Sequence, residues 1–203
     1  MKLLSLNNGA THGYVNEDYW ARYAVEQGQA ARPEATAETE GDLGLNLAID
    51  SKLRGCDLFA LRVHDVVQGS QVAARAIVMQ KNTQRPVEFE LTKQTRDAVA
   101  AWIMAAHLKP DQFLFPSRVT ESPHLSTRQY SRIVGSGMRS IGLDPAAYGT
   151  HSMRRTKPTL IYRRTRNLRA VQLLLGHSKL ESTVRYLGIE VDDALEIAEQ
   201  TEV

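Results

Sequence analysis

One stretch of this 203-residue sequence has the pattern of a β-hairpin, and the patterns on both sides of it are helical. Residues 73–79 form an apolar run typical of a strand, and residues 81–84 (Lys-Asn-Thr-Gln) are typical of a turn. After the turn, Val87, Phe89 and Leu91 alternate with polar residues as on a half-buried strand. The sequence therefore predicts a mixed α+β fold, mainly helical, with a small antiparallel sheet or hairpin packed against a helical bundle.

Capping and stop residues divide the rest of the chain into helices. An apolar face over residues 43–53 predicts a buried helix that ends at Gly55, and Asp57 is expected to cap a short helix through Arg62. After the hairpin, a helix is expected to start near Thr92 and to end before Pro110. Further signals are two capping boxes (Ser126 with Gln129, Ser178 with Glu181), two other starts (Thr150, Asn167) and two stops (Gly142, Gly176). Tyr186 then falls on the helix that begins near Ser178, or close to its end.

The composition is that of a globular protein, with 42% hydrophobic and 24% charged residues. The longest strongly apolar stretch, residues 99–106, is far shorter than the roughly 18 residues that a membrane helix needs. Residues 3–6 are too short for the apolar core of a signal peptide. Cys56 is the only cysteine, which excludes an internal disulfide and a multi-cysteine metal site. We therefore expect a soluble, cytoplasmic protein without membrane contact.

Three segments are expected along the chain. Residues 27–42 are rich in Ala, Glu and Gly and poor in large apolar groups, so residues 1–42 are interpreted as a loosely structured segment and linker. Residues 43–190 hold the dense folding signals and form the predicted functional domain. Residues 191–203 are interpreted as an acidic tail helix.

The charge of the chain is strongly polarised, although its net value is only +2. Residues 151–185 contain nine Lys and Arg against one acid, Glu181, so this segment carries +8 and the rest of the chain carries −6. Residues 186–203 contain six acids and no Lys or Arg. This pattern indicates a surface that binds a polyanion, followed by an acidic tail. The alternative is a solvated helix surface without a partner.

Short motifs in the basic segment carry the chemistry. They are His151-Ser-Met-Arg154, Leu175-Gly-His177-Ser and Thr183-Val-Arg-Tyr186, with spacings of 23 residues from Arg154 to His177 and 9 from His177 to Tyr186. Upstream, Arg54 stands in Leu-Arg-Gly-Cys-Asp-Leu, and Lys81 lies at the hairpin turn. These residues resemble, in order and in spacing, the active-site set of the tyrosine recombinase (phage integrase) family, over roughly residues 43–190. Taken singly, each has an ordinary structural interpretation; six together in order favour the functional one.

The resemblance implies the catalytic-domain fold of that family and a role for each residue. Arg54 and Arg154 would clamp the non-bridging oxygens of a DNA phosphodiester, whose negative charge grows in the transition state. Tyr186 would be the nucleophile, and Lys81 would protonate the departing 5′ oxygen. The two histidines would assist, His151 in proton transfer at the nucleophile and His177 by a hydrogen bond to the phosphate.

The predicted function is that of a site-specific recombinase or integrase acting through a 3′-phosphotyrosine intermediate. No cofactor, ATP or metal is expected, because the phosphotyrosine conserves the energy of the bond. The partner is double-stranded DNA at the nucleoid, with self-association to a tetramer on DNA and a possible accessory DNA-bending protein. The residues expected to contact DNA are Arg155, Lys157, Arg164, Arg166, Arg169 and Lys179. The alternatives are a catalytically impaired DNA-binding relative and, more remotely, relaxation of the type IB topoisomerase kind.

Three features depart from the family pattern. Members usually carry a separate N-terminal helical domain that grips the other face of the DNA, and only about forty residues precede the catalytic region here, so we expect that half of the clamp to be absent. The helix that should precede the Leu43 segment is also hard to identify. Pro158 follows Arg154 by four residues and is expected to kink its helix.

In the tail, Ile189, Ala194, Leu195 and Ala198 predict an amphipathic helix over 189–200 that docks on a neighbouring subunit or folds back on its own domain.

Overall fold

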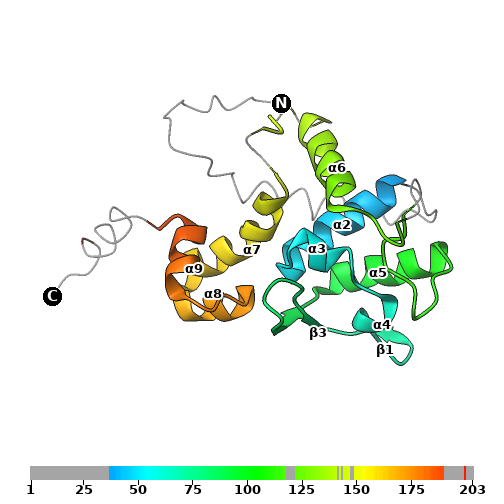
Figure 1. Ribbon diagram of the computed structural model, residues 1–203, viewed down its shortest axis with the longest axis horizontal. Coiled ribbons are helices and arrows are strands. Elements are labelled where there is room, and N and C mark those ends of the chain that lie inside the picture. Colours follow the sequence, from blue (N-terminus) through cyan, green and yellow to red (C-terminus); the bar gives the residue numbers. More distant parts are fainter. Residues whose placement is uncertain are drawn as a thin grey trace.

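The computed structural model describes residues 37–117, 122–140, 142, 144–146, 149–189 and 199 (Figure 1). The predicted N-terminal segment, up to residue 36, lies outside the described residues. The predicted tail helix over 191–203 also lies outside them, apart from residue 199. Within the described ranges, no helix combines the length and the apolar character needed to cross a membrane.

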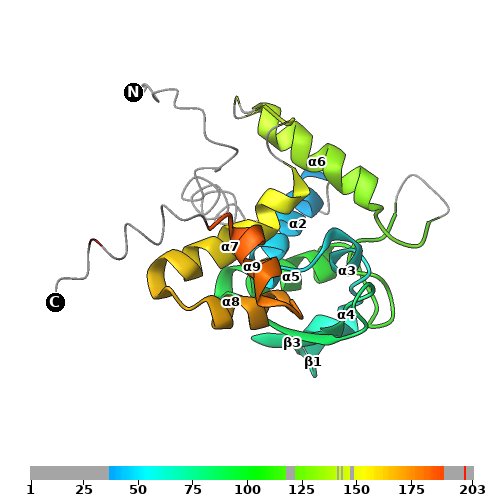
Figure 2. The ribbon, with the colours of Figure 1, turned by 60° about the vertical axis from the view of Figure 1, so that its left-hand side comes forward.

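Helix α2 (Ala37–Ser51) is the central element of the fold. It packs against α5 (Lys93–Ala105), α6 (Thr127–Ser140) and α7 (Thr150–Thr165), and Figure 2 shows these helices around it. Its described side chains are buried on every face, which is the pattern of a core helix rather than a surface helix. The helix begins at Ala37, so residues 37–42 are not the linker that their small, polar composition predicted. Packing against the other helices orders a segment that composition alone assigns to a loop.

The predicted hairpin is confirmed. Strands β3 (Arg75–Met79) and β4 (Pro86–Glu90) pair antiparallel, with Val78 opposite Val87, and the inner face buries Ala76, Val87 and Phe89. A second hairpin of two-residue strands, β1 (Val67–Gln68) and β2 (Gln71–Val72), was not predicted because strands this short have no alternation to detect.

Two short helices lie between α2 and the hairpins. Helix α3 (Gly55–Leu58) has Arg54 at its N-cap position and α4 (Val63–Val66) has Arg62, in both cases without a capping hydrogen bond to the arginine side chain. The prediction that Asp57 caps a helix through Arg62 is therefore wrong. Asp57 lies inside the first turn of α3, and its carboxylate Oδ1 accepts a hydrogen bond from the backbone N–H of Lys81 instead.

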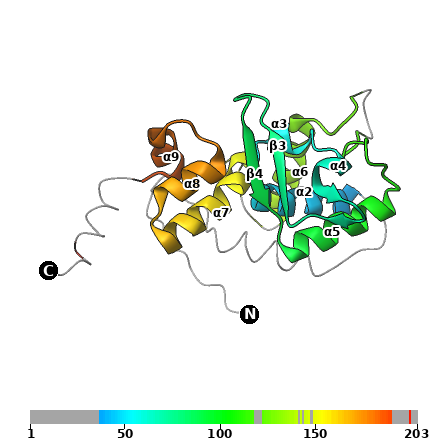
Figure 3. The same ribbon diagram turned by 90° about the horizontal axis from the view of Figure 1, so that it is seen from below.

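The C-terminal helices form a second, smaller core beside the hairpin. Helices α8 (Leu168–Leu175) and α9 (Leu180–Leu187) pack with α7 around Val171, Leu175 and Leu187, and α8 contacts β4 (Figure 3). The predicted start and stop of α8 are confirmed: Asn167 accepts the Ala170 N–H, and Gly176 ends the helix at φ +67°.

Three helix-start predictions have mixed outcomes. The box of Ser126 with Gln129 is present, since each side chain accepts the other's backbone N–H. The box of Ser178 with Glu181 is wrong: Lys179 precedes α9, without a side-chain cap. Helix α7 begins at Thr150, but its cap position is Gly149.

Pro158 lies in the interior of α7 and is buried there. The helix continues through it to Thr165, so the proline does not end the helix that carries Arg154. Because proline has no N–H, the carbonyl of Arg154 lacks the helical hydrogen bond that it would otherwise accept from residue 158.

The approach of α8 to β4 predicts that Gly176→Ala is strongly destabilising. A Cβ at position 176 would lie 2.6 Å from Val87 Cγ2, at a φ that disfavours side chains. We expect the free energy of unfolding to fall by about 3 kcal/mol, the sum of left-handed strain and overpacking. Gly69→Ala is the matched control, because Gly69 has φ +63° but nothing within 4 Å of the added atom. It should cost only about 1–2 kcal/mol. Equal losses in denaturant unfolding would show that the contact with Val87 carries no energy.

Candidate active site

Arg154 is the most deeply held of the predicted site residues. It is only 5% exposed, and its Nε donates to the Lys52 carbonyl at 2.6 Å while its Nη2 donates to the Leu175 carbonyl at 3.0 Å. These bonds tie α7 to the end of α2 and to the end of α8. Both acceptors are neutral, so the guanidinium is fixed in place without a hydrogen-bonded carboxylate in the described structure, although the charge of Asp57 acts on it electrostatically.

Arg54 is held in the same manner. Its Nη1 donates at 2.8 Å to the Gln80 side-chain carbonyl, and Gln80 is 1% exposed at the end of β3. The same Gln80 oxygen also accepts the Thr83 hydroxyl at 2.8 Å. Sequence reasoning missed Gln80, since nothing in its local pattern marks it. Arg54, like Arg154, is thus oriented by a neutral carbonyl oxygen and not by a carboxylate.

Lys81 follows Gln80 in the turn between β3 and β4. Its backbone N–H donates to Asp57 at 2.9 Å, which ties the tip of the hairpin to α3 close to Arg54. Its side chain is exposed and makes no hydrogen bond or ion pair with any described residue. The structure therefore brings the Lys81 backbone, but not its ammonium group, into contact with the site.

Tyr186, on α9, lies against the cations of α7. Its ring is 5.5 Å from the Arg154 guanidinium and 5.8 Å from that of Arg155, and it meets the His177 ring edge-on at 5.4 Å. The hydroxyl is buried and has no hydrogen-bond partner among the described residues. Burial raises the pKa of Tyr186 to about 12, against the opposing effect of the nearby arginines. The phenol is therefore protonated at neutral pH, and a nucleophilic role requires a proton acceptor.

His177 follows Gly176 at the end of α8. Burial, reinforced by the charges of Arg154 and Arg54, lowers the pKa of His177 to about 4, so the imidazole is neutral at pH 7. Its Nδ1 lies 3.1 Å from the hydroxyl of Thr183, which is fully buried on α9. When that hydroxyl donates to Nδ1, the proton of the neutral ring is on Nε2, which becomes a hydrogen-bond donor.

His151 lies in the first turn of α7 and is exposed. It shares a pocket of about 400 Å³ with residues of α7 and α9, namely Arg155, Ser182, Arg185 and Tyr186. The pocket gives access from solvent to the tyrosine through a basic lining.

Five of the six predicted site residues thus gather in one region. Tyr186 contacts both Arg154 and His177, Arg54 acts electrostatically on all three, and His151 shares the pocket of Tyr186. A buried phenol, a neutral imidazole and two guanidinium groups held by neutral oxygens are suited to binding and attacking an oxyanion such as a phosphate. In the described part of the chain, no three His, Cys, Asp or Glu side chains are grouped to hold a metal ion.

The residues predicted to contact DNA have two kinds of environment. Arg155 is half-buried beside Tyr186, and four others are exposed on the side of α7, α8 and α9: Arg164, Arg166, Arg169 and Lys179. Lys157 differs from these. Its ammonium is paired with Asp50 at 2.9 Å and Glu90 at 2.8 Å, facing inward toward α2 and β4. Because two carboxylates already neutralise this ammonium group, Lys157 is not suited to bind a DNA phosphate, and the prediction that it contacts DNA is wrong.

Known proteins share both the sequence pattern and the fold. The profile described as the phage integrase family matches residues 25–191. A probable integrase/recombinase, YoeC, of Bacillus subtilis is 30% identical over 71% of this chain and 75% of its own length. A tyrosine recombinase of Pseudothermotoga lettingae is 29% identical over 72% of this chain and 49% of its own length.

Solved structures agree at the level of the fold. The XerH site-specific recombinase in a post-cleavage complex with its difH substrate matches with a TM-score of 0.70 at 18% identity, over 93% of this chain and 52% of the recombinase. The XerA recombinase matches with a TM-score of 0.70 at 17% identity, over 97% of this chain and 66% of its own. The chain therefore spans about half the length of the Pseudothermotoga relative and of the XerH chain.

The buried hydroxyl of Tyr186 predicts that Tyr186→Phe stabilises the fold. The substitution keeps the ring contacts with Arg154 and His177 and removes a buried oxygen that lacks a partner. We expect the free energy of unfolding to rise by about 1 kcal/mol in denaturant titrations. Tyr162→Phe on α7 is the control, because that hydroxyl is not among the buried unpartnered atoms. A loss of stability in Tyr186→Phe would mean that the hydroxyl has a bonding partner after all.

The pKa of Tyr186 predicts its ionisation behaviour. Because burial raises this pKa to about 12, phenolate absorbance from Tyr186 should be absent at pH 10 and should grow only near pH 12. The contribution of Tyr186 is the difference between the titrations of wild type and Tyr186→Phe, which cancels the other six of the seven tyrosines. Ionisation of this residue below pH 10 would show that the arginines outweigh burial.

Proposed function

This chain belongs to the phage integrase family, and we propose that it acts as a site-specific DNA recombinase that cuts and rejoins DNA through a covalent bond between Tyr186 and a 3′-phosphate. One observation carries the proposal. The ring of Tyr186, whose hydroxyl is buried, contacts His177 and the guanidinium of Arg154, which neutral carbonyl oxygens hold in place. The family's chemistry needs a nucleophile and phosphate-binding cations at one place, and these residues meet that need.

Arg154 and Arg54 would bind the non-bridging oxygens of the scissile phosphodiester. The negative charge on those oxygens grows as the nucleophile bonds to phosphorus, so cations fixed beforehand stabilise the transition state more than the ground state. Arg154 is fixed by two carbonyls and Arg54 by Gln80. The neutral partners matter, because a carboxylate at either place would repel the phosphate.

Tyr186 would supply the attacking oxygen. Its O–H bond breaks, the oxygen bonds to phosphorus, and the bond from phosphorus to the 5′ oxygen breaks. The phenolic proton goes to a base, for which His151 is the candidate because both residues line the same pocket. The departing 5′ oxygen takes a proton from Lys81, whose exposed side chain would have to reach the DNA from the hairpin turn. Rejoining is the reverse reaction with a new 5′ hydroxyl.

His177 would act as a neutral hydrogen-bond donor to the phosphate. With Nδ1 accepting from Thr183, its Nε2–H would be free to donate to a non-bridging oxygen. The lowered pKa supports this role, since the neutral ring keeps this hydrogen-bonding pattern at pH 7.

The proposed substrate is double-stranded DNA at the nucleoid. The exposed cations of the C-terminal helices, Arg164, Arg166, Arg169 and Lys179, would bind its backbone beside the active site. The XerH recombinase is bound to its difH substrate in the solved structure, which supports the same class of partner here. Assembly as a tetramer on DNA, docking of residues 189–200 on a neighbouring subunit and help from a DNA-bending protein belong to the proposal as well.

A kink at Pro158 that displaced Arg154 would favour the alternative of an impaired DNA-binding relative. Helix α7 continues past this proline, and Arg154 keeps both of its hydrogen bonds. We therefore favour the active enzyme over the impaired relative and over the relaxation activity of the topoisomerase kind.

A nicked suicide duplex carrying the recombination site tests the proposal, because release of a short 5′ fragment traps the covalent adduct on a denaturing gel. Wild type should form the adduct and Tyr186→Phe should form none. Arg154→Ala should form it about 100- to 1000-fold more slowly. Arg163→Ala is the control on the same helix: Arg163 is exposed and outside the proposed site, so it should stay near the wild-type rate. Adduct formation by Tyr186→Phe would identify another nucleophile and overturn the assignment.

A further inference from the structure

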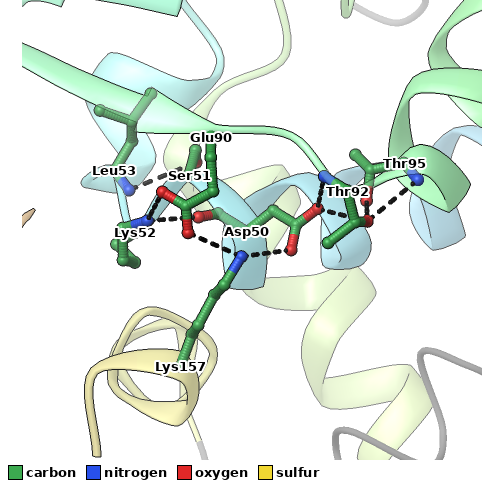
Figure 4. Close-up of polar contacts among 8 residues, drawn as sticks. All are labelled: Asp50, Ser51, Lys52, Leu53, Glu90, Thr92, Thr95 and Lys157. Carbon is green, nitrogen blue, oxygen red and sulfur yellow. Dashed lines mark hydrogen bonds and ion pairs between the residues drawn. The ribbon is translucent and has the colours of Figure 1, made fainter. Parts of the chain in front are cut away.

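Four charged side chains lie together between α2, β4 and α7, apart from the proposed catalytic set (Figure 4). The Lys52 ammonium donates to Glu90 Oε2 at 2.8 Å, and the Lys157 ammonium binds Glu90 Oε1 at 2.8 Å and Asp50 Oδ1 at 2.9 Å. Asp50 Oδ2 also accepts the N–H and the hydroxyl of Thr92. Two cations and two anions therefore neutralise each other inside the fold.

Lys52 is the unusual member of this cluster. Its side chain is 0% exposed, and its backbone has φ +58°, a left-handed conformation that is uncommon for a residue with a side chain. Burial and backbone strain both cost free energy, so a lysine persists there only if its surroundings hold it. The ammonium is held by Glu90 and by the Asp50 carbonyl at 2.8 Å, two residues back on its own chain.

This conformation of Lys52 determines where its carbonyl points. That carbonyl is the acceptor for Arg154 Nε at 2.6 Å. The side chain and the backbone of one residue thus connect Glu90 on β4 with Arg154 on α7. On α7 itself, Lys157 lies one turn beyond Arg154 and binds the carboxylates of Asp50 and Glu90. The helix that carries Arg154 is therefore held at the arginine itself and one turn beyond it.

We propose that Lys52, Glu90, Asp50 and Lys157 form a positioning unit for Arg154, in which the buried ammonium of Lys52 holds the backbone carbonyl that aims the guanidinium at the scissile phosphate. None of the four is a catalytic residue. The inference rests on the proposed function for the identity of the phosphate, but the link from Glu90 through Lys52 to Arg154 is a property of the protein alone.

The alternative is a purely structural role for the charges. Buried ion pairs can often be replaced by apolar residues without loss of stability, so packing alone does not require a lysine at this place. Burial raises the pKa of Glu90, but hydrogen bonds from Lys157 and Lys52 outweigh it and lower the pKa to about 2. Glu90 is thus ionised throughout the physiological pH range.

Lys52→Met separates the two roles, because methionine fills a similar volume but cannot bond to Glu90 or to the Asp50 carbonyl. Glu90→Gln is the second variant, which keeps the size of the acceptor and removes its charge. Lys93→Met is the matched control: Lys93 forms an exposed ion pair with Asp97 at 2.6 Å and takes part in none of the hydrogen bonds or ion pairs described for the four charged residues. If Lys52→Met does not fold, the same measurements on Glu90→Gln decide the question.

The first readout needs no DNA. In protein with ¹⁵N-labelled arginine, the Nε–H resonance that disappears in Arg154→Lys is assigned to Arg154. Because this N–H is buried and bonded to the Lys52 carbonyl, its proton should exchange slowly with solvent. Lys52→Met and Glu90→Gln should speed the exchange about tenfold or more and shift the resonance, while Lys93→Met should not. An Arg154 resonance unchanged in both variants would overturn the proposal, whether or not the protein cuts DNA.

The second readout is the rate of covalent adduct formation on two nicked duplexes, one with an ordinary scissile phosphodiester and one with a methylphosphonate there. The methyl group removes the charge that Arg154 balances. A misaimed guanidinium should therefore slow the phosphodiester reaction about 10- to 100-fold, with a clearly smaller effect on the methylphosphonate and with unchanged DNA affinity. Equal losses on both substrates would indicate general damage and contradict a positioning role. A wild type that forms no adduct at all would defeat the proposed function, and the resonance measurement would still decide the positioning role.

Discussion

The hydrogen bond from Arg154 Nε to the Lys52 carbonyl is the contact on which the rest of the site depends. It joins residues 102 positions apart and links the central helix α2 to the C-terminal helices. A buried guanidinium must have partners, and a carboxylate would be the strongest one. This fold instead gives both Arg154 and Arg54 neutral oxygen acceptors, while it gives the lysines of the positioning unit carboxylates. The lysine charges beside the site are thus paired with carboxylates, whereas the arginine guanidinium groups within the site are hydrogen-bonded to neutral oxygens.

Three residues around Arg154 have features that lower the stability of the folded protein. Lys52 adopts a left-handed backbone conformation, Pro158 removes a helical hydrogen bond next to Arg154, and the hydroxyl of Tyr186 is buried without a partner in the described structure. Each feature is unfavourable for stability alone. Their concentration around one guanidinium is typical of a protein in which a functional geometry is maintained against local stability.

Local signals in the sequence predicted the elements that are decided locally. The hairpin alternation, the Asn167 cap and the Gly176 stop were found because residues within a few positions determine them. Residues 37–42 were assigned to a linker because their composition is poor in large apolar groups, and only packing against distant helices makes them helical. Lys157 was assigned to the DNA-binding surface because a lysine in a basic segment is usually exposed. Its partners Asp50 and Glu90 lie more than 60 positions away, where no local pattern can reveal them.

The candidate site shows the same limit. Order and spacing singled out Arg54, His151, Arg154, His177 and Tyr186, and the fold brings these five residues into one region. Gln80 and Lys52, in contrast, hold the two arginines through contacts that no sequence motif reveals. The central claim is that Tyr186 becomes bonded to DNA. Digestion of the trapped adduct followed by mass spectrometry tests it most directly. The account predicts a nucleotide attached through a 3′-phosphate to the peptide containing Tyr186, and attachment to any other residue would contradict it.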